Sequence, residues 1–174
     1  MLSDGKILKC ALLVLACCMY VGGQYVQYSN CGSRGNVLSV QLVPCDDPSN
    51  CTLVRGKNSR LIIQFIPNNV VSDLQAVAYV RLGGLARTIK LPIPSGCKKN
   101  ANVCNKGWKQ VVTFETDFII RKNLPKVAVA VRFVLLDQYE RALVCVRMNA
   151  HVDDHIDLND LRRIIKKKNS NYPN

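Results

Sequence analysis

The chain has 174 residues, a formal net charge of +12, nine cysteines and 6% aromatic residues. Its length is that of one domain, so two separate cores are not expected. The basic residues are scattered singly and are not interleaved with aromatic side chains, which argues against binding to nucleic acid; in an exported chain they favour solubility and attraction to anionic membrane surfaces.

The first predicted element is a secretory signal peptide over residues 1–23. Two lysines precede an apolar stretch from Cys10 to Val21, and two glycines follow it. About a dozen apolar residues are fewer than the roughly 20 that a membrane-spanning helix needs. We therefore expect cleavage near Gln24 and a secreted, extracellular protein, or one that resides in the lumen of lysosomes or endosomes.

Removal of this segment leaves six cysteines, and an even number in an exported chain indicates a disulfide framework. Six cysteines allow many pairings, and the sequence alone does not choose among them. Short spacing favours the pairs Cys45–Cys51 and Cys97–Cys104, which leaves Cys31 for Cys145. A metal site at these cysteines is disfavoured because no two of them have the two-residue spacing of zinc ligands.

Apolar and polar residues alternate from Val37 to Met148, which predicts an all-β fold. Two glycines at 83 and 84 predict a bend or hairpin. Seven strands separated by short turns fit a two-sheet sandwich. The predicted strands are 37–43, 60–66, 75–82, 86–91, 110–120, 127–136 and 142–148, with Leu38, Val40 and Leu42 on one face of the first and Leu61, Ile63 and Phe65 on one face of the second.

The segment "LPIPSGC" interrupts this pattern. Pro92 and Pro94 lack a backbone donor, so they cannot lie in the middle of a paired ladder and must mark where the chain leaves a sheet edge. An edge held by a disulfide loop would let the two sheets part there and form a mouth. The alternation assigns three apolar faces to its inside: Ile89 and Leu91; Phe114, Phe118 and Ile120; and Val127, Val129, Val131, Phe133 and Leu135.

Residues 153–174 form a basic tail of different character. Asp153 and Asp154 are suited to cap a helix, and a run of lysines and arginines suits its C-terminal end. The narrow apolar stripe of such a helix would dock on the sandwich or lie on an anionic bilayer. A solvated tail without a helix is the alternative.

The sequence predicts no enzyme, no cofactor and no metal. It has no "GxSxG" motif and no phosphate-binding glycine pair. His151 and His155 lie outside the predicted β domain's strands, and no third ligand accompanies them. Asn50-Cys51-Thr52 is a glycosylation sequon, so Asn50 is a candidate for modification.

Four stretches resemble a known family: "CGS" at Cys31, the Cys45–Cys51 pair, "LPIPSGC", and "NLPKVAVAVRFVLLD" followed by Cys145. Together they resemble the ML lipid-recognition domain, most closely its soluble sterol carriers. The resemblance covers residues 30–152 and places the domain at 24–152. It implies an immunoglobulin-like sandwich of seven strands, the disulfides Cys31–Cys145, Cys45–Cys51 and Cys97–Cys104, and lipid binding without catalysis.

The resemblance also implies where a lipid enters. It places Leu91, Ile120 and Leu124 at the mouth, and Leu91 and Leu124 are aliphatic where the sterol carriers have aromatic residues. The predicted ligand-binding residues are Val80, Ile89, Leu91, Phe114, Phe118, Ile120, Leu124, Val131 and Phe133. Arg87, Lys90, Lys122 and Lys126 are expected at a basic rim that meets a ligand carboxylate or membrane phosphates.

We therefore expect a monomeric carrier that holds a sterol or fatty-acid-like lipid between two sheets. It would deliver this lipid to an anionic membrane surface or to a membrane sterol transporter. The alternative is an extracellular recognition module for bacterial lipids or chemical signals, in innate immunity or chemosensation. A third alternative is a secreted structural protein without a filled cavity.

Overall fold

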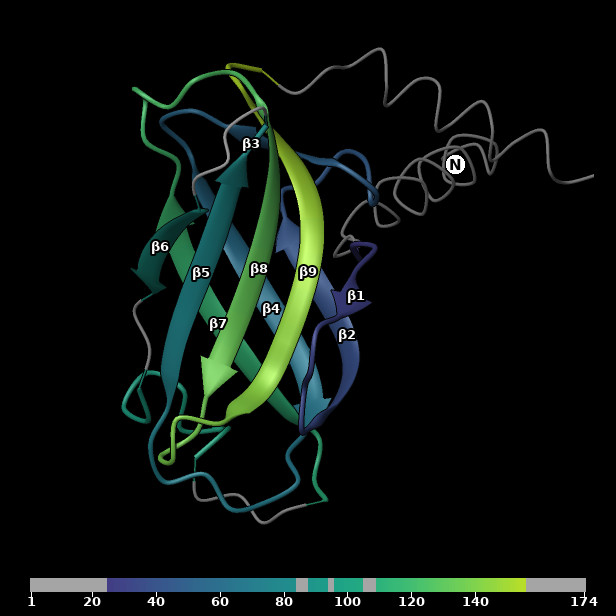
Figure 1. The fold of residues 1–174 in the computed structure, drawn as a ribbon, viewed down its shortest axis with the longest axis vertical. Helices are drawn as coiled ribbons and strands as arrows, with labels where there is room; N and C mark the ends of the chain where they lie inside the picture. The colour runs from purple at the N-terminus through teal and green to yellow at the C-terminus, as the bar shows by residue number, and fades with distance from the viewer. Residues whose placement is uncertain (1–24, 84–87, 94–95, 105–108, 156–174) are drawn as a thin grey trace, which may run out of the picture.

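The structure is a computed structural model that describes residues 25–83, 88–93, 96–104 and 109–155, with residues 88–93 described by their backbone alone. In these ranges the chain forms two sheets packed face to face (Figure 1). No helix among the described residues is long and apolar enough to cross a membrane. The strands are β1 (Ser29–Asn30), β2 (Asn36–Val43), β3 (Cys51–Val54), β4 (Asn58–Ile66), β5 (Gln75–Leu82), β6 (Thr88–Ile93), β7 (Val112–Ile119), β8 (Ala128–Leu136) and β9 (Ala142–Asp153).

One sheet has the order β1-β9-β8-β5-β6, and β3 also pairs with β9; the other has the order β2-β4-β7. The two-sheet, all-β prediction is confirmed, and each predicted strand overlaps one of the seven longer strands. The short β1 and β3 are additional, and β3 runs parallel to β9. Gly83 follows β5, which pairs antiparallel with β6 as a hairpin would, and Gly84 lies outside the described residues. The predicted helix of the tail lies outside the described residues.

The predicted apolar face of the first strand is wrong at one position. Leu38 is 46% exposed, whereas Val40 and Leu42 are buried. A register shift between Val37 and Ser39 in the pairing of β2 with β4 is the cause, because an extra residue turns the side chains before it to the other face. The face of Leu61, Ile63 and Phe65 is buried as predicted.

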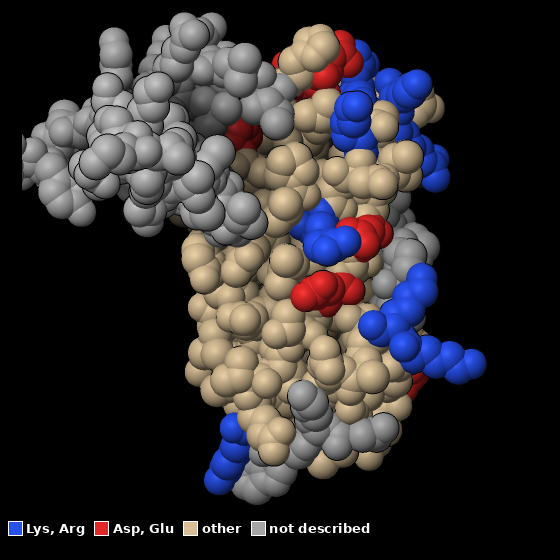
Figure 2. All heavy atoms as spheres, turned by 180° about the vertical axis from the view of Figure 1, so that it is seen from behind, with Lys and Arg blue, Asp and Glu red and all other residues tan. Residues whose placement is uncertain are grey.

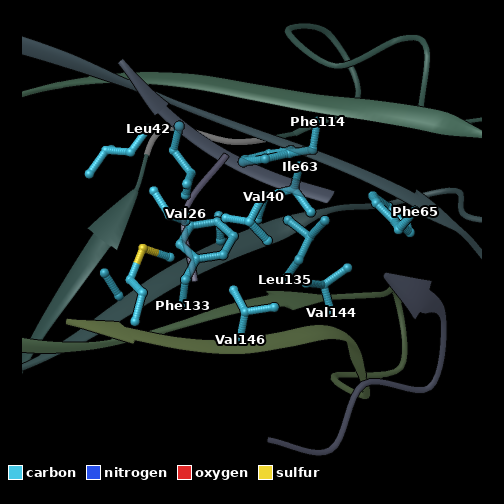
Figure 3. Close-up of a cluster of buried hydrophobic side chains, with 14 of the residues drawn as sticks. Val26, Val40, Leu42, Ile63, Phe65, Phe114, Phe133, Leu135, Val144 and Val146 are labelled. Atoms are coloured by element: carbon cyan, nitrogen blue, oxygen red, sulfur yellow. The ribbon is translucent and has the colours of Figure 1, made fainter. Parts of the chain in front are cut away.

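The core lies between the sheets and is built from their alternating inward positions (Figure 3). The register aligns Val40, Ile63 and Phe114 across β2, β4 and β7. It aligns Ala78, Phe133 and Val146 across β5, β8 and β9. Each row therefore presents a continuous apolar surface to the other sheet.

The N-terminal segment closes one side of the sandwich. Val26 donates its backbone N–H to the Val40 carbonyl at 2.9 Å, on β2 of the smaller sheet. A few residues later β1 pairs with β9 of the larger sheet, where Cys31 is bonded to Cys145. Residues 25–31 thus form a strap that ties the two sheets together along this side (Figure 1).

The opposite side is bounded by two edge strands, β6 and β7 (Figure 1). Pro92 pairs with Val77 in the edge strand β6, as the missing donor of proline predicts. The loop after β6 contains the Cys97–Cys104 disulfide and turns back onto β7, where the Asn100 side-chain oxygen accepts a 3.1 Å hydrogen bond from Glu115 N–H. This hydrogen bond joins the loop to β7 on this side of the sandwich.

Candidate ligand-binding site

Six apolar side chains at one end of the sandwich are only half buried, although they pack against the core. We call them the apolar rim: Val80, Leu82, Phe118, Leu124, Val127 and Val131. Inward-facing apolar residues deeper in the sandwich are nearly all fully buried. The rim is therefore one place where the described core meets the surface; Tyr28, Val37 and Cys97 are partly buried elsewhere.

The topology explains why these residues gather. β5 ends and β8 begins at the same end of the larger sheet, and Val80 lies opposite Val131 in their register. β7 ends there in the smaller sheet, and Phe118 faces inward because it is two steps from the buried Thr116 and four from Phe114. The turn from β7 to β8 then supplies Leu124 and Val127, so both sheets contribute to the rim.

Below the rim the two sheets are in contact through a pair of rings. Phe114 of β7 and Phe133 of β8 point toward each other (Figure 3), with ring centroids 5.6 Å apart and the planes tilted by 42°. Their exposed fractions are 0% and 2%. The rings therefore form the floor of the apolar rim, and a ligand that reaches deeper must separate them.

The predicted mouth residues fall into three groups. Leu124 lies in the apolar rim, with Phe118, Val80 and Val131. Ile120 is 5% exposed and packs in the core just after β7, where its backbone bonds to that of Gly56 and Lys57. The side chains of Ile89 and Leu91 lie outside the described residues, but the register places their backbone beside Val80 and Ala78.

Leu82 was not among the predicted positions, and Val127 was predicted to face the inside of the mouth but was not listed as a ligand contact. Both continue an inward alternation that the sequence displays, Leu82 after Val80 and Val127 before Val129. The signal was present, but only the register of β5 with β8 shows that these positions lie at the same end.

The predicted basic rim is partly neutralised. Lys126 Nζ lies 3.0 Å from Asp153 Oδ1 and 2.7 Å from Asp154 Oδ2, and hydrogen bonds to Asp154 and Asp153 raise its pKa. Arg55 Nε also donates to Asp154 Oδ1 at 2.6 Å. The two aspartates expected to cap a tail helix are thus held in ion pairs on the sandwich itself.

Lys122 is exposed, and no ion pair joins it to another described residue. Lys57, in the turn before β4, and Arg121, beside Lys122 after β7, are also exposed. Figure 2 shows Lys and Arg side chains gathered at this end of the smaller sheet's outer face. The side chains of Arg87 and Lys90 lie outside the described residues. The basic character of this end therefore comes, in the described part, from Lys57, Arg121 and Lys122.

Asn50 lies in the turn before β3, and its carbonyl accepts a 3.2 Å hydrogen bond from His151 Nδ1. Thr52 bonds through its hydroxyl to Asp46 and lies 3.1 Å from His151 Nε2. Burial raises the pKa of Asp46, but the hydrogen bonds from Thr52 outweigh it and lower that pKa overall. The prediction that His151 lies outside the strands is wrong, because β9 extends through it to Asp153 and pairs it with Thr52. His151 holds the turn that carries the sequon; glycosylation of Asn50 stays a prediction. No three His, Cys, Asp or Glu side chains cluster as metal ligands within the described ranges.

The three disulfides are those the resemblance implies: Cys31–Cys145, Cys45–Cys51 and Cys97–Cys104. These features define the class of the protein: a disulfide-bonded β-sandwich of two sheets with an apolar rim at one end. The model of the ML domain family matches residues 25–152, and the chain belongs to this family.

Relatives and solved structures agree with this assignment. The chain is 23% identical over 142 residues to NPC intracellular cholesterol transporter 2 of Danio rerio, covering 81% of this chain and 94% of the relative. It is 29% identical over 138 residues to the ecdysteroid-regulated 16 kDa protein of Manduca sexta, covering 77% and 93%. The fold is similar to a Niemann-Pick type C2 protein from the Japanese carpenter ant (TM-score 0.61, 18% identity, 73% and 99% coverage) and to chicken MD-1 complexed with lipid IVa (TM-score 0.50, 11% identity, 70% and 85% coverage).

Proposed function

We propose that the protein is a non-enzymatic carrier that holds one sterol, or another single apolar lipid, between its two sheets and transfers it to membranes. The apolar rim above the Phe114–Phe133 pair is the observation that carries this proposal. Relatives named as intracellular cholesterol transporters support it. Three disulfides support export to an oxidising compartment, outside the cell or in the endolysosomal lumen.

The energetics suit a carrier. Burial of apolar groups contributes about 0.8 kcal/mol per methylene, so an acyl chain of roughly sixteen carbons gains about 13 kcal/mol before the cost of association. Few polar contacts are then needed, because they only orient the head group. The described rim is aliphatic apart from Phe118, which favours tolerance of flexible chains as well as sterols.

The proposal is tested by binding measurements on the mature domain. Lipid that co-purifies is extracted with organic solvent and identified by mass spectrometry, and a fluorescent sterol and a fluorescent fatty acid are then titrated into the emptied protein. Saturable binding of one molecule per chain is expected. A protein that carries no lipid and binds neither probe would contradict the proposal.

Two neighbouring variants locate the site. Phe118→Ser removes an inward rim side chain and should weaken binding about tenfold, since a buried phenylalanine contributes about 1.5–3 kcal/mol and this one is only half buried. Ile119→Ser is the matched control, because Ile119 is 65% exposed on the other face of the same strand. Equal effects of both variants would place the ligand elsewhere. Saturable binding of lipopolysaccharide with poor sterol transfer between vesicles would instead identify a recognition module.

A further inference from the structure

A hollow of about 490 Å³ lies outside the sandwich, on the outer face of the larger sheet. Its floor comes from outward positions of β8, so it faces away from the apolar rim, although Leu82 of the rim also lines it. Ala128 and Ala130 alternate there with the inward Val129 and Val131. The register places Ala130 between Arg81 of β5 and Asn149 of β9.

Small residues create this hollow. Ala128 and Ala130 present only methyl groups at the centre of the sheet, and Gly83 presents no side chain beside Ala128. A Cβ atom on Gly83 would lie 2.9 Å from the Ala128 carbonyl oxygen, so the close approach of the two strands requires glycine. One outward row further along β8, the guanidinium carbon of Arg132 lies 4.3 Å from the centroid of the Tyr79 ring, so larger side chains follow the small ones on this face.

The walls carry complementary polar groups. Arg81 stands on one side, and no ion pair joins it to another described residue. Asn50 and Asn149 stand on the other side with side-chain amides that both donate and accept. Arg81 and Asn149 are two strand spacings apart, which is about 10 Å.

The surrounding charge is positive. Arg132 and Arg147 lie directly opposite each other in the next row, an arrangement of like charges that an anion would stabilise. The carboxylate nearest in sequence to the wall, Asp47, is already engaged by the backbone N–H and hydroxyl of Ser49. Asp153 at the end of β9 is paired with Lys126.

From these features we propose that the hollow is a second ligand site, which binds a polyhydroxylated ligand of about sugar size that bears a phosphate or sulfate ester. The guanidinium of Arg81 receives the ester oxygens, since arginine matches such oxyanions with two parallel hydrogen bonds. The amides of Asn50 and Asn149 receive hydroxyl groups, and the alanine floor contacts the ring. The volume lies within the range of small-molecule sites.

The test uses the mature, disulfide-bonded protein after its mass has been checked for the absence of a glycan on Asn50. Glucose 6-phosphate, glucose and inorganic phosphate are titrated with detection by calorimetry or by NMR shifts. Glucose 6-phosphate should bind more tightly than either fragment. Arg81→Gln should weaken it about tenfold or more, because a hydrogen bond to a charged group is lost. Ala130→Leu, which fills the floor without a change of charge, should abolish binding.

Matched controls separate the site from general charge and volume effects. Arg34→Gln removes an exposed arginine at the other end of the molecule, and Ala101→Leu enlarges an exposed alanine in the 96–104 loop. Both should leave binding unchanged. All four variants should also retain binding of the fluorescent sterol or fatty acid, which distinguishes failure of this site from failure of the carrier function.

A second arm distinguishes the source of the ligand. Phosphatidylcholine vesicles containing phosphatidylinositol 4-phosphate are compared with vesicles of equal charge containing phosphatidylserine. Preference for the phosphoinositide that Arg81→Gln and Ala130→Leu remove, without binding of glucose 6-phosphate, would identify a lipid headgroup as the ligand. Binding of glucose 6-phosphate that these variants remove would identify a free ligand. No binding in either arm, or binding that Arg34→Gln weakens as much as Arg81→Gln does, would overturn the proposal.

Discussion

The contact between Phe114 and Phe133 makes a quantitative prediction about how a lipid enters. Both rings are fully buried at the centre of the sandwich, and their centroids are 5.6 Å apart. Truncation of either ring to alanine should cost about 3–5 kcal/mol of the free energy of unfolding, because a large cavity is left. The pair should contribute a further coupling of about 0.5–1.5 kcal/mol, the usual value for aromatic pairs.

A double-mutant cycle isolates this coupling. Phe114→Ala, Phe133→Ala and the double variant are unfolded in urea, with and without a saturating lipid, and the slope of free energy against urea is checked for constancy. Phe114→Leu and Phe133→Leu provide a milder cycle if the alanine variants do not fold. In the empty protein the coupling should fall in the stated range. In the loaded protein it should approach zero, because a lipid that reaches the floor separates the rings.

Two results would refute this reasoning. A coupling that lipid leaves unchanged would mean that the ligand stays above the rings or binds outside the sandwich. A coupling near zero in the empty protein would mean that the rings do not touch in solution. Lipid at about 100 times its dissociation constant should also stabilise the wild-type protein by about 2.7 kcal/mol, an independent check that binding has occurred.

Three further predictions concern stability and delivery. Burial raises the pKa of Asp137, but hydrogen bonds from Arg141 and from backbone N–H groups lower it to about 2. Because this value is below the unfolded value of 3.8, about 2 kcal/mol of folding stability should be present above pH 4 and lost as the pH falls toward 2. Acid unfolding of the Asp137→Asn variant should lack this loss. Replacing Cys31 and Cys145 by serine should cost about 4–5 kcal/mol in chemical denaturation, because the bridge closes a long loop; a loss below about 1 kcal/mol would argue against the loop-closure explanation. Lys122→Glu should slow lipid transfer to anionic but not to neutral vesicles several-fold, and an unchanged rate would show that this end of the protein does not face the membrane.

The alternation of residue types predicted the long strands well, because a sheet with one buried face enforces it. It failed at Leu38, where a bulge that no local pattern announces reverses the side chains of β2. It could not find β3, whose four residues pair in parallel with β9 about a hundred positions away. Short strands of this kind are stabilised by distant partners, so their own residues carry little signal.

The candidate sites, like the strands, could be predicted from the sequence only in part. The inward positions of Phe118 and Val131 followed from the strand pattern, whereas the full burial of Ile120 in the core, in contrast to the half-buried Phe118 before it, is seen only in the structure. The outer hollow was not predicted at all. Its alanines look like ordinary strand residues, and only the alignment of three strands brings them beside Arg81 and Asn149.

The strap of residues 25–31 has a consequence for how a lipid enters and leaves the protein. It joins the two sheets along one side of the sandwich. On the opposite side, the loop of residues 96–104 is hydrogen-bonded to β7. Under the proposed function, a lipid that enters and leaves through the apolar rim releases last the part that entered first. Donor and acceptor bilayers would then be served by the same end of the molecule in turn, and the protein would act as a shuttle between them and not as a bridge.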